Sequence, residues 1–315
     1  MLLIALSYRM AVKSNYLVEE SSNIATIMLQ DQKLGAAEAD EIQKREFSID
    51  EPLEINFWGD AGETVLESRI NEQKMTVSLV LTGEKTGLIV PGSDVLSWKE
   101  YGCFLDSATA FELFGMQQAI GQTIWCKDRM YTVCGTFESV QKVMVCRAAR
   151  QDGQVFTTIS CRIPERGSVS SHLENFLMRH GMAGKYSDFT FLGYVSHDFL
   201  LLLPVCLAIR LIRILMNVRG KRGGRANLTV YFLILVIVSG TMIFAGLNFR
   251  VPADMIPTAW SDFSFWGHWW KTQRENLLYI FRTTQGEAQL SMLWNFFRSV
   301  FGSMWAVVCT FLFLC

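Results

Sequence analysis

The sequence lacks the short motifs that mark the common nucleotide-binding and catalytic sites. It contains no G-x-x-x-x-G-K-[ST], G-x-S-x-G, H-E-x-x-H or C-x-x-C. Gly83–Gly87 (GEKTG) superficially resembles a phosphate-binding loop, but its spacing cannot cradle phosphates and it fits a turn between strands. We therefore expect that the chain hydrolyses no nucleotide, is not an enzyme and holds no cofactor.

Histidine is scarce and scattered, which argues against a histidine metal site. The four histidines lie far apart in the sequence. We expect His172 and His180 on helix surfaces and His197 at the membrane interface. The fourth histidine is His268.

The eight cysteines do not form the framework of a disulfide-stapled secreted protein. Five precede the first long apolar span, in the expected outer domain, and three lie in apolar runs. Because five is an odd number, the cysteines of the outer domain cannot all pair with one another. Cys126 and Cys134 are expected as cross-strand neighbours on a hairpin. We favour small buried thiols, with a disulfide between these two as the alternative.

Net charge is also nearly absent, since 29 Lys and Arg balance 30 Asp and Glu. No basic excess points to nucleic acid. The charge is nevertheless uneven: residues 14–198 hold 26 acidic and 16 basic residues, whereas residues 199–227 hold six basic and no acidic ones. This step in charge coincides with the first long apolar runs.

Three apolar runs predict membrane helices. Leu228–Phe249 contains no charge over 22 residues, about 33 Å of helix, which spans a hydrocarbon core of about 30 Å. Phe199–Met216 is a second span if Arg210 and Arg213 reach the interface at its end. Ser299–Cys315 is a third, which we interpret as truncated; Met1–Leu6 is interpreted as the second half of a further span.

The short loop between the two best spans sets the orientation. By the positive-inside rule it is cytoplasmic, because it carries Arg219, Lys221, Arg222 and Arg225. We expect a multi-pass protein of the plasma membrane with its large domain outside the cytoplasm. The expected segments are a partial helix (1–13), an outer domain (14–197), a helix (198–217), the cytoplasmic loop (218–227), a helix (228–249), an outer aromatic segment (250–298) and a last helix (299–315).

The outer domain has the mixed pattern of an α+β fold, and the alternatives are a single lobe or two lobes. Helices are expected at 36–46, 105–114 and 171–180; strands at 54–58, 75–81 and 88–91; and local strand pairs at 123–126 with 130–134 and at 140–147 with 155–162. Asp106, Ser107 or Thr109 is the expected N-cap of the second helix.

Aromatic residues crowd the second outer segment close to a span. An interfacial belt in contact with membrane lipid is the simpler interpretation, and a substrate-binding or lipid-sensing ledge is the alternative. The candidate residues are Trp260, Phe263, Phe265, Trp266, Trp269 and Trp270.

One stretch resembles a known family. Gly102–Gly115 (GCFLDSATAFELFG) is followed by Ile120–Ile124 (IGQTI) and Met130–Thr136 (MYTVCGT). Together with the order of helices and outer segments, this stretch resembles the MacB/FtsX-like permease subunits of ABC transporters. In that family a helix ending in LFG leads into a similar hairpin.

The resemblance implies transmission of motion across the membrane. A separate cytoplasmic ATPase would push on the membrane helices, so that the outer domain moves a hydrophobic or peptide-like substrate or a signal. The implied ATPase contacts are Arg210, Arg213 and the four basic loop residues, and a second permease copy or paralogue is a further implied partner. The alternatives are a membrane-anchored binding or sensor module without an ATPase, or an inactive permease fragment.

Overall fold

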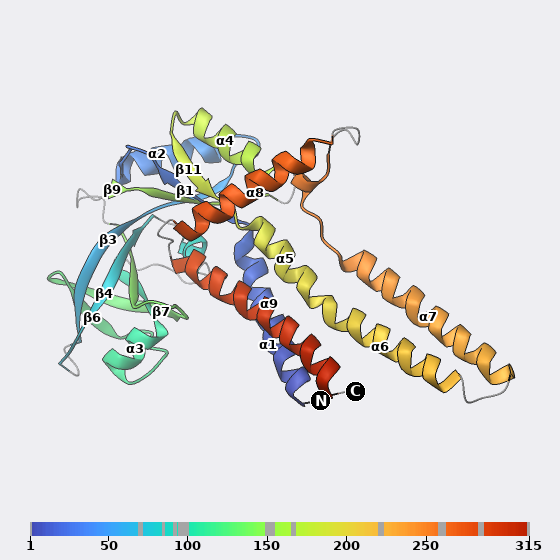
Figure 1. Cartoon of the computed structure of the whole chain (residues 1–315). Coiled ribbons are helices and arrows are strands. Elements are labelled where there is room, and N and C mark those ends of the chain that lie inside the picture. Colours follow the sequence, from blue (N-terminus) through green and yellow to red (C-terminus); the bar gives the residue numbers. More distant parts are fainter. Residues whose placement is uncertain are drawn as a thin grey trace. The chain divides into compact units, whose positions relative to one another are not determined.

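The structure is a computed structural model of the chain (Figure 1). In it the chain forms two compact units. The helical unit comprises residues 1–20, 191–256 and 293–315, and the β unit comprises residues 21–190 and 257–292. The described residues are 2–68, 72–83, 86–90, 93, 101–148, 155–164, 168–219, 224–257, 263–282 and 287–313.

Long helices make up the helical unit. Among the residues that the structure describes, three stretches are long and apolar enough to cross a membrane: Thr190–Asn217, Leu228–Asn248 and Gln289–Leu312. The expected class, helical spans combined with an α+β domain, is thus confirmed. The helices are α1 (Leu2–Ser22), α5 (Thr190–Leu200), α6 (Leu202–Arg219), α7 (Gly224–Asn248) and α9 (Glu287–Phe313).

Helix bounds differ from the hydropathy pattern where charged residues continue a helix. Residues 2–6 belong to the single helix α1, which continues through Arg9 and Lys13 to Ser22. The first apolar span likewise begins at Thr190 rather than Phe199. Hydropathy detects the apolar part of a helix, whereas the backbone hydrogen bonds continue through polar turns.

Helices α1 and α9 pack closely through small residues. A Cβ added to Gly302 would lie 3.1 Å from the Ala11 Cβ and 3.1 Å from the Ser7 carbonyl oxygen. Ser303 and Ala306, on the same side of α9, are fully buried. Small side chains let helix backbones approach in this way within a membrane.

The β unit is built on one nine-stranded sheet in the order β11-β1-β10-β3-β4-β8-β5-β7-β6, with a separate pair of β2 and β9. The strands are β1 (Ile24–Leu29), β2 (Leu34–Gly35), β3 (Glu54–Ser68), β4 (Gln73–Thr82), β5 (Gly102–Asp106), β6 (Thr123–Cys126), β7 (Arg129–Phe137), β8 (Val143–Arg147), β9 (Val155–Phe156), β10 (Thr158–Arg162) and β11 (Gly184–Ser187).

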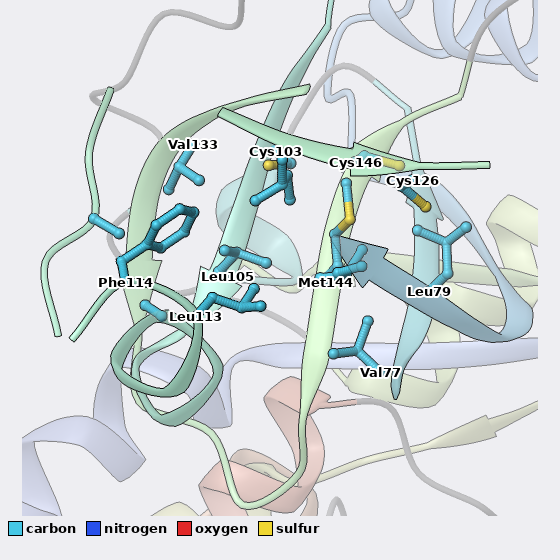
Figure 2. Packing of buried hydrophobic residues seen from close by; sticks show 14 of the residues in the cluster. Val77, Leu79, Cys103, Leu105, Leu113, Phe114, Cys126, Val133, Met144 and Cys146 are labelled. Carbon is cyan, nitrogen blue, oxygen red and sulfur yellow. The ribbon is translucent and has the colours of Figure 1, made fainter. Parts of the chain in front are cut away.

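An additional pairing of β6 with β3 closes six of these strands into a ring. Following the pairings, the ring runs β3-β4-β8-β5-β7-β6 and back to β3. Its interior is a cluster of buried apolar side chains, including Leu79, Leu105, Met144 and three cysteines (Figure 2). Helix α3 (Ser107–Phe114) adds Leu113 and Phe114 to this cluster.

A second cluster lies between the other end of the sheet and two helices, α2 (Ala36–Phe47) and α4 (Val169–Arg179). Phe57 and Phe176 are among its fully buried side chains. This cluster is separate from the ring interior, and a third buried cluster contains Trp58, Phe104 and Val145.

A buried carboxylate joins the two helices of this second lobe. Glu46, only 1% exposed, accepts hydrogen bonds from the Leu53 amide (3.0 Å) and the Arg179 guanidinium (2.8 Å) and lies 2.7 Å from Nε2 of His180. The expectation of His180 on a helix surface is wrong, because this carboxylate draws the ring inward.

Local predictions succeeded where the contacts are local. The 123–134 hairpin is confirmed as β6 and β7, antiparallel. Within it, however, Cys126 lies opposite Arg129, so Cys126 and Cys134 are not cross-strand neighbours, and both are free thiols. The tight turn places Arg129 opposite Cys126, so Cys134, five residues further along β7, lies beyond the paired part of β6.

Two strand predictions are wrong. Thr86–Leu88 is a 3-10 turn, and the apolar residues that suggested a strand, Leu88 to Val90, are simply buried; Pro91 lies outside the described residues. The segments 140–147 and 155–162 do not pair with each other: β8 pairs with β4 and β5, and β10 pairs with β1 and β3. Strands distant in sequence supply both sets of partners. The turn at Asp152 and Gly153 lies outside the described residues.

Asp106 connects the resembling motif to the rest of the ring. One of its carboxylate oxygens accepts from the Thr109 amide at 2.9 Å, which caps α3, and the other accepts from the Val143 amide at 2.9 Å, where β8 begins. Asp106 is therefore the N-cap among the three candidates. Helix α3 ends at Gly115, whose φ of 72° requires the left-handed conformation.

Replacing Asp106 with Ala should lower the free energy of unfolding by about 2–4 kcal/mol, because it removes a helix cap and leaves the buried Val143 amide without an acceptor. Urea unfolding of the purified chain, followed by near-UV circular dichroism, measures the change. Glu112→Ala is the matched control, since its ion pair with Lys142 is about half exposed and should contribute less than about 1 kcal/mol. Equal losses in the two variants would contradict the role of Asp106.

Candidate functional site

The expected cytoplasmic hairpin is formed by two long helices. Arg219 is the last residue of α6 and Arg225 is the second of α7. Lys221 and Arg222 lie outside the described residues. The end of α6 at Arg219 and the start of α7 at Gly224 bound the basic segment, which stays a candidate docking element.

The two arginines within α6 have different surroundings. Arg213 is exposed, whereas the Arg210 guanidinium donates to the backbone carbonyl of Thr310 in α9. This carbonyl belongs to the last turn of α9, where carbonyls lack partners within the helix and carry partial negative charge. Arg210 therefore joins α6 to the end of α9, a role that its charge alone did not reveal.

The aromatic residues divide between two faces of α8 (Phe265–Arg282). Trp266 and Trp270 are exposed, by 41% and 60%, and Phe263 just before the helix is 89% exposed. Phe265 and Trp269 are half-buried. Trp260 lies outside the described residues. The cluster predicted from sequence is therefore partly packing and partly open surface.

The other face of α8 is fixed to the β unit. The Asn276 side chain donates to the Asp188 carbonyl at 2.7 Å and accepts from the Asp188 amide at 3.2 Å, and Ile280 is 1% exposed. These contacts hold α8 beside the end of β11, so the exposed tryptophans are carried by the β unit.

A polar cluster that the sequence did not predict lies within the helical unit, around Glu19 of α1. One oxygen of Glu19, Oε1, lies 2.6 Å from Nδ1 of His197, 3.1 Å from Nη1 of Arg250 and 3.2 Å from Nδ2 of Asn15. Ser196 donates to Oδ1 of Asn15 at 2.7 Å. The cluster joins α1, α5 and the residues that follow α7.

His197 lies between two oxygen atoms that belong to different helices. Its Nδ1 faces the Glu19 carboxylate of α1, and its Nε2 lies 3.0 Å from the Asn248 carbonyl oxygen at the end of α7. The positive charge of Arg250 offsets the negative charge of the Glu19 carboxylate, and the Asp198 carboxylate accepts from the Arg250 amide at 3.2 Å.

The sequence contained only part of the signal for this cluster. His197 was expected at the membrane interface, but Glu19 and Arg250 are 231 residues apart and no spacing rule connects them. The adjacent acidic residues Glu19 and Glu20, close to the predicted membrane interface, were the available clue. Across the described ranges, no group of three or more His, Cys, Asp or Glu residues is arranged to hold a metal ion.

Comparison with solved structures finds several similar domains, of which three are described below. The chain is similar to the periplasmic region of MacB from Actinobacillus actinomycetemcomitans (11% identity, TM-score 0.42, 54% of this chain and 90% of that one). It is also similar to the extracellular domain of the ABC-type transporter YknZ from Gram-positive bacteria (12%, 0.36, 52% and 96%). The third is a domain of a permease protein from Porphyromonas gingivalis (14%, 0.38, 54% and 91%).

No protein-family model and no curated protein matches the chain.

Replacing Glu19 with Gln should lower the unfolding temperature of the chain in detergent and reduce its free energy of unfolding by about 1–2 kcal/mol. The reason is that His197 and Arg250 lose a charged partner, whose side chain is one-third exposed. Thermal melting followed by circular dichroism of the helices measures it. The neighbouring exposed Glu20→Gln removes the same charge without these contacts and should change stability by less than about 0.5 kcal/mol. A larger effect at Glu20 would refute the assignment.

Proposed function

We propose that the chain is a non-catalytic, permease-like membrane subunit of an ABC transporter, which works with a separate cytoplasmic ATPase and has its β unit outside the cytoplasm. The spans, the basic hairpin and the resemblance of the motif within residues 100–136 support this assignment. In this proposal the ATPase drives movement of the helices, and the β unit acts on a hydrophobic or peptide-like substrate or relays a signal.

The observation that carries the proposal is how directly two helices continue into the sheet. Asn23 alone separates α1 from β1, and only Asp188 and Phe189 separate β11 from α5. These two strands pair with each other, Thr26 opposite Ser187. Short connections of this kind leave little slack, so a movement of either helix reaches paired strands.

Side chains and backbone tighten the same joints. The Thr190 hydroxyl donates to the Ser22 carbonyl at 3.4 Å, and the Ile163 amide donates to the Asn23 carbonyl at 2.8 Å. Asn23 is therefore held by β10 as well as by its chain neighbours. A binding module that only needed a membrane anchor would not require such tight connections, which favours transmission of motion over simple anchoring.

The basic hairpin is the proposed ATPase contact. Replacing its four basic residues (Arg219, Lys221, Arg222 and Arg225) with Ser should reduce co-purification of the cognate ATPase about tenfold or more. Each exposed charge contact contributes about 0.5–1 kcal/mol, and about 1.4 kcal/mol corresponds to tenfold. The measurement is pull-down from mild detergent after co-expression with each ATPase encoded nearby.

Replacing three exposed basic residues of α8 with Ser (Lys271, Arg274 and Arg282) is the control and should leave capture unchanged. Full-length, membrane-inserted chain that captures no ATPase would overturn the transporter assignment in favour of an anchored module or an inactive fragment.

Slack inserted at the joint should uncouple the two units without preventing assembly. Two glycines after Asn23 should leave ATPase capture intact but abolish an ATP-dependent change in the β unit, because a flexible connection no longer transmits displacement. A fluorophore on Val140→Cys, an exposed position, reports that change. The same insertion between Lys127 and Asp128, in the tight turn of the 123–137 hairpin, should preserve the response. A preserved response in the joint variant would exclude this route.

A further inference from the structure

The interior of the strand ring contains a pair of opposed cysteines. In the antiparallel pairing of β5 with β8, Cys103 lies directly opposite Cys146. Residues directly opposed in such a pair have Cα atoms about 4.5–5.5 Å apart, and disulfides join Cα atoms about 4.4–6.8 Å apart. The backbone therefore already has the spacing that a disulfide needs.

Both side chains also point to the same side of the sheet. Cys103 and Cys146 belong to the ring interior. So do Leu105 and Met144, the opposed pair two residues further along the strands (Figure 2). The intervening pair, Phe104 and Val145, belongs to a different cluster on the opposite side. Alternation along both strands thus fixes the two thiols on one face.

The remaining cysteines of the β unit are less well placed. Cys126 shares the interior, but its strand β6 pairs with β3 and β7, and its Sγ lies 3.5 Å from the Thr64 hydroxyl. Cys134 packs with the cluster on the opposite side, and Cys161 belongs to the second lobe. Only Cys103 and Cys146, among the described cysteines, face each other across one pair of strands.

Both thiols are unreactive once the ring has closed. Cys103 is fully buried and Cys146 is 1% exposed. Burial, reinforced by neighbouring thiols, raises the pKa of Cys103, and burial raises the pKa of Cys146 to about 12. Since the thiolate is the reacting species, oxidation belongs to the period of folding, before the ring excludes solvent.

We propose that Cys103 and Cys146 are an oxidation site and form an interior disulfide as the β unit folds. The inference rests on the proposed location of the β unit outside the cytoplasm, where disulfides form and persist. The oxidant is a disulfide-bearing thiol oxidoreductase. One cysteine thiolate attacks the disulfide of the oxidoreductase and forms a mixed disulfide with it. The second cysteine thiolate then attacks the sulfur of the first cysteine, which breaks the mixed disulfide. The oxidoreductase leaves as a dithiol that carries the two protons lost by the cysteines.

The bond would tie together the part of the ring that is built from consecutive chain. Cys103 and Cys146 enclose α3 and the β6–β7 hairpin, residues 104–145. Within the ring, Cys103 has to rotate away from the Thr132 carbonyl oxygen, which its Sγ now approaches at 3.6 Å. A covalent closure of this segment limits the unfolded chain and so stabilises the folded ring.

The test uses the full chain, expressed in cells that insert it into the membrane and form disulfides outside the cytoplasm. The chain is then denatured in the presence of a thiol-blocking maleimide and digested without reductant. Mass spectrometry should find a peptide that joins Cys103 to Cys146, and reduction should lower the melting temperature of the chain. Cys103→Ser should abolish the linked peptide and the sensitivity to reductant, whereas the matched buried variant Cys161→Ser should retain both.

A membrane-impermeant maleimide on Val140→Cys in intact cells separates the two proposals. If Val140→Cys is labelled from outside while Cys103 and Cys146 carry the blocking group, the disulfide proposal is wrong and the location stands. A disulfide between Cys126 and Cys146 would also overturn the proposed pairing of Cys103 with Cys146. If Val140→Cys is not labelled from outside, the proposed location fails and the oxidation proposal fails with it.

Discussion

The bend in β3 is the constraint on which the β unit depends. A strand of 15 residues extends about 50 Å if straight, longer than either hydrophobic core needs. The register with β4 shifts between Asp60 and Glu63, and Gly62, at a φ of 77°, occupies the left-handed region. Asp60 stabilises this bulge by accepting from the Gly62 amide at 2.8 Å. The strand can therefore change direction without losing its partners.

The bend lets one strand contribute to two cores. Before the bulge, Phe57 faces the second lobe and β3 pairs with β10. After it, Leu66 lies in the ring interior and β3 pairs with β4 and β6. Because both lobes share a continuous strand, a displacement in one is carried into the other by backbone hydrogen bonds rather than by a flexible linker. The same strand also lies next to β10, which pairs with β1, the strand that follows α1; β1 in turn pairs with β11, the strand that precedes α5.

The sequence predicted features that depend on local pattern and missed those that depend on distant pairing. The span at Leu228–Asn248 and the 123–134 hairpin required only hydropathy and a turn, so both were found. The partners of β8 and β10 lie far away in sequence and could not be inferred from a turn between them. For the same reason the basic hairpin was a visible candidate site from sequence alone. The Glu19 cluster was not, since its members come from α1, from α5 and from the residues after α7, which are far apart in sequence.

Two glutamates with similar partners show how burial separates a fixed contact from an adjustable one. Glu46 and Glu19 each bind a histidine and an arginine, but the Glu46 side chain is 1% exposed and that of Glu19 is 32% exposed. Breaking the Glu46 group would leave an uncompensated charge in a core, which costs about 3–5 kcal/mol.

At Glu19, water can replace a lost partner, so separation of α1 from α5 costs much less. The Glu19 group therefore suits a contact between helices that move relative to each other, whereas the Glu46 group suits a lobe that moves as one body. The positions of the two groups agree with this division: Glu46 lies between two helices of one core, and Glu19 lies four residues before the joint at Asn23.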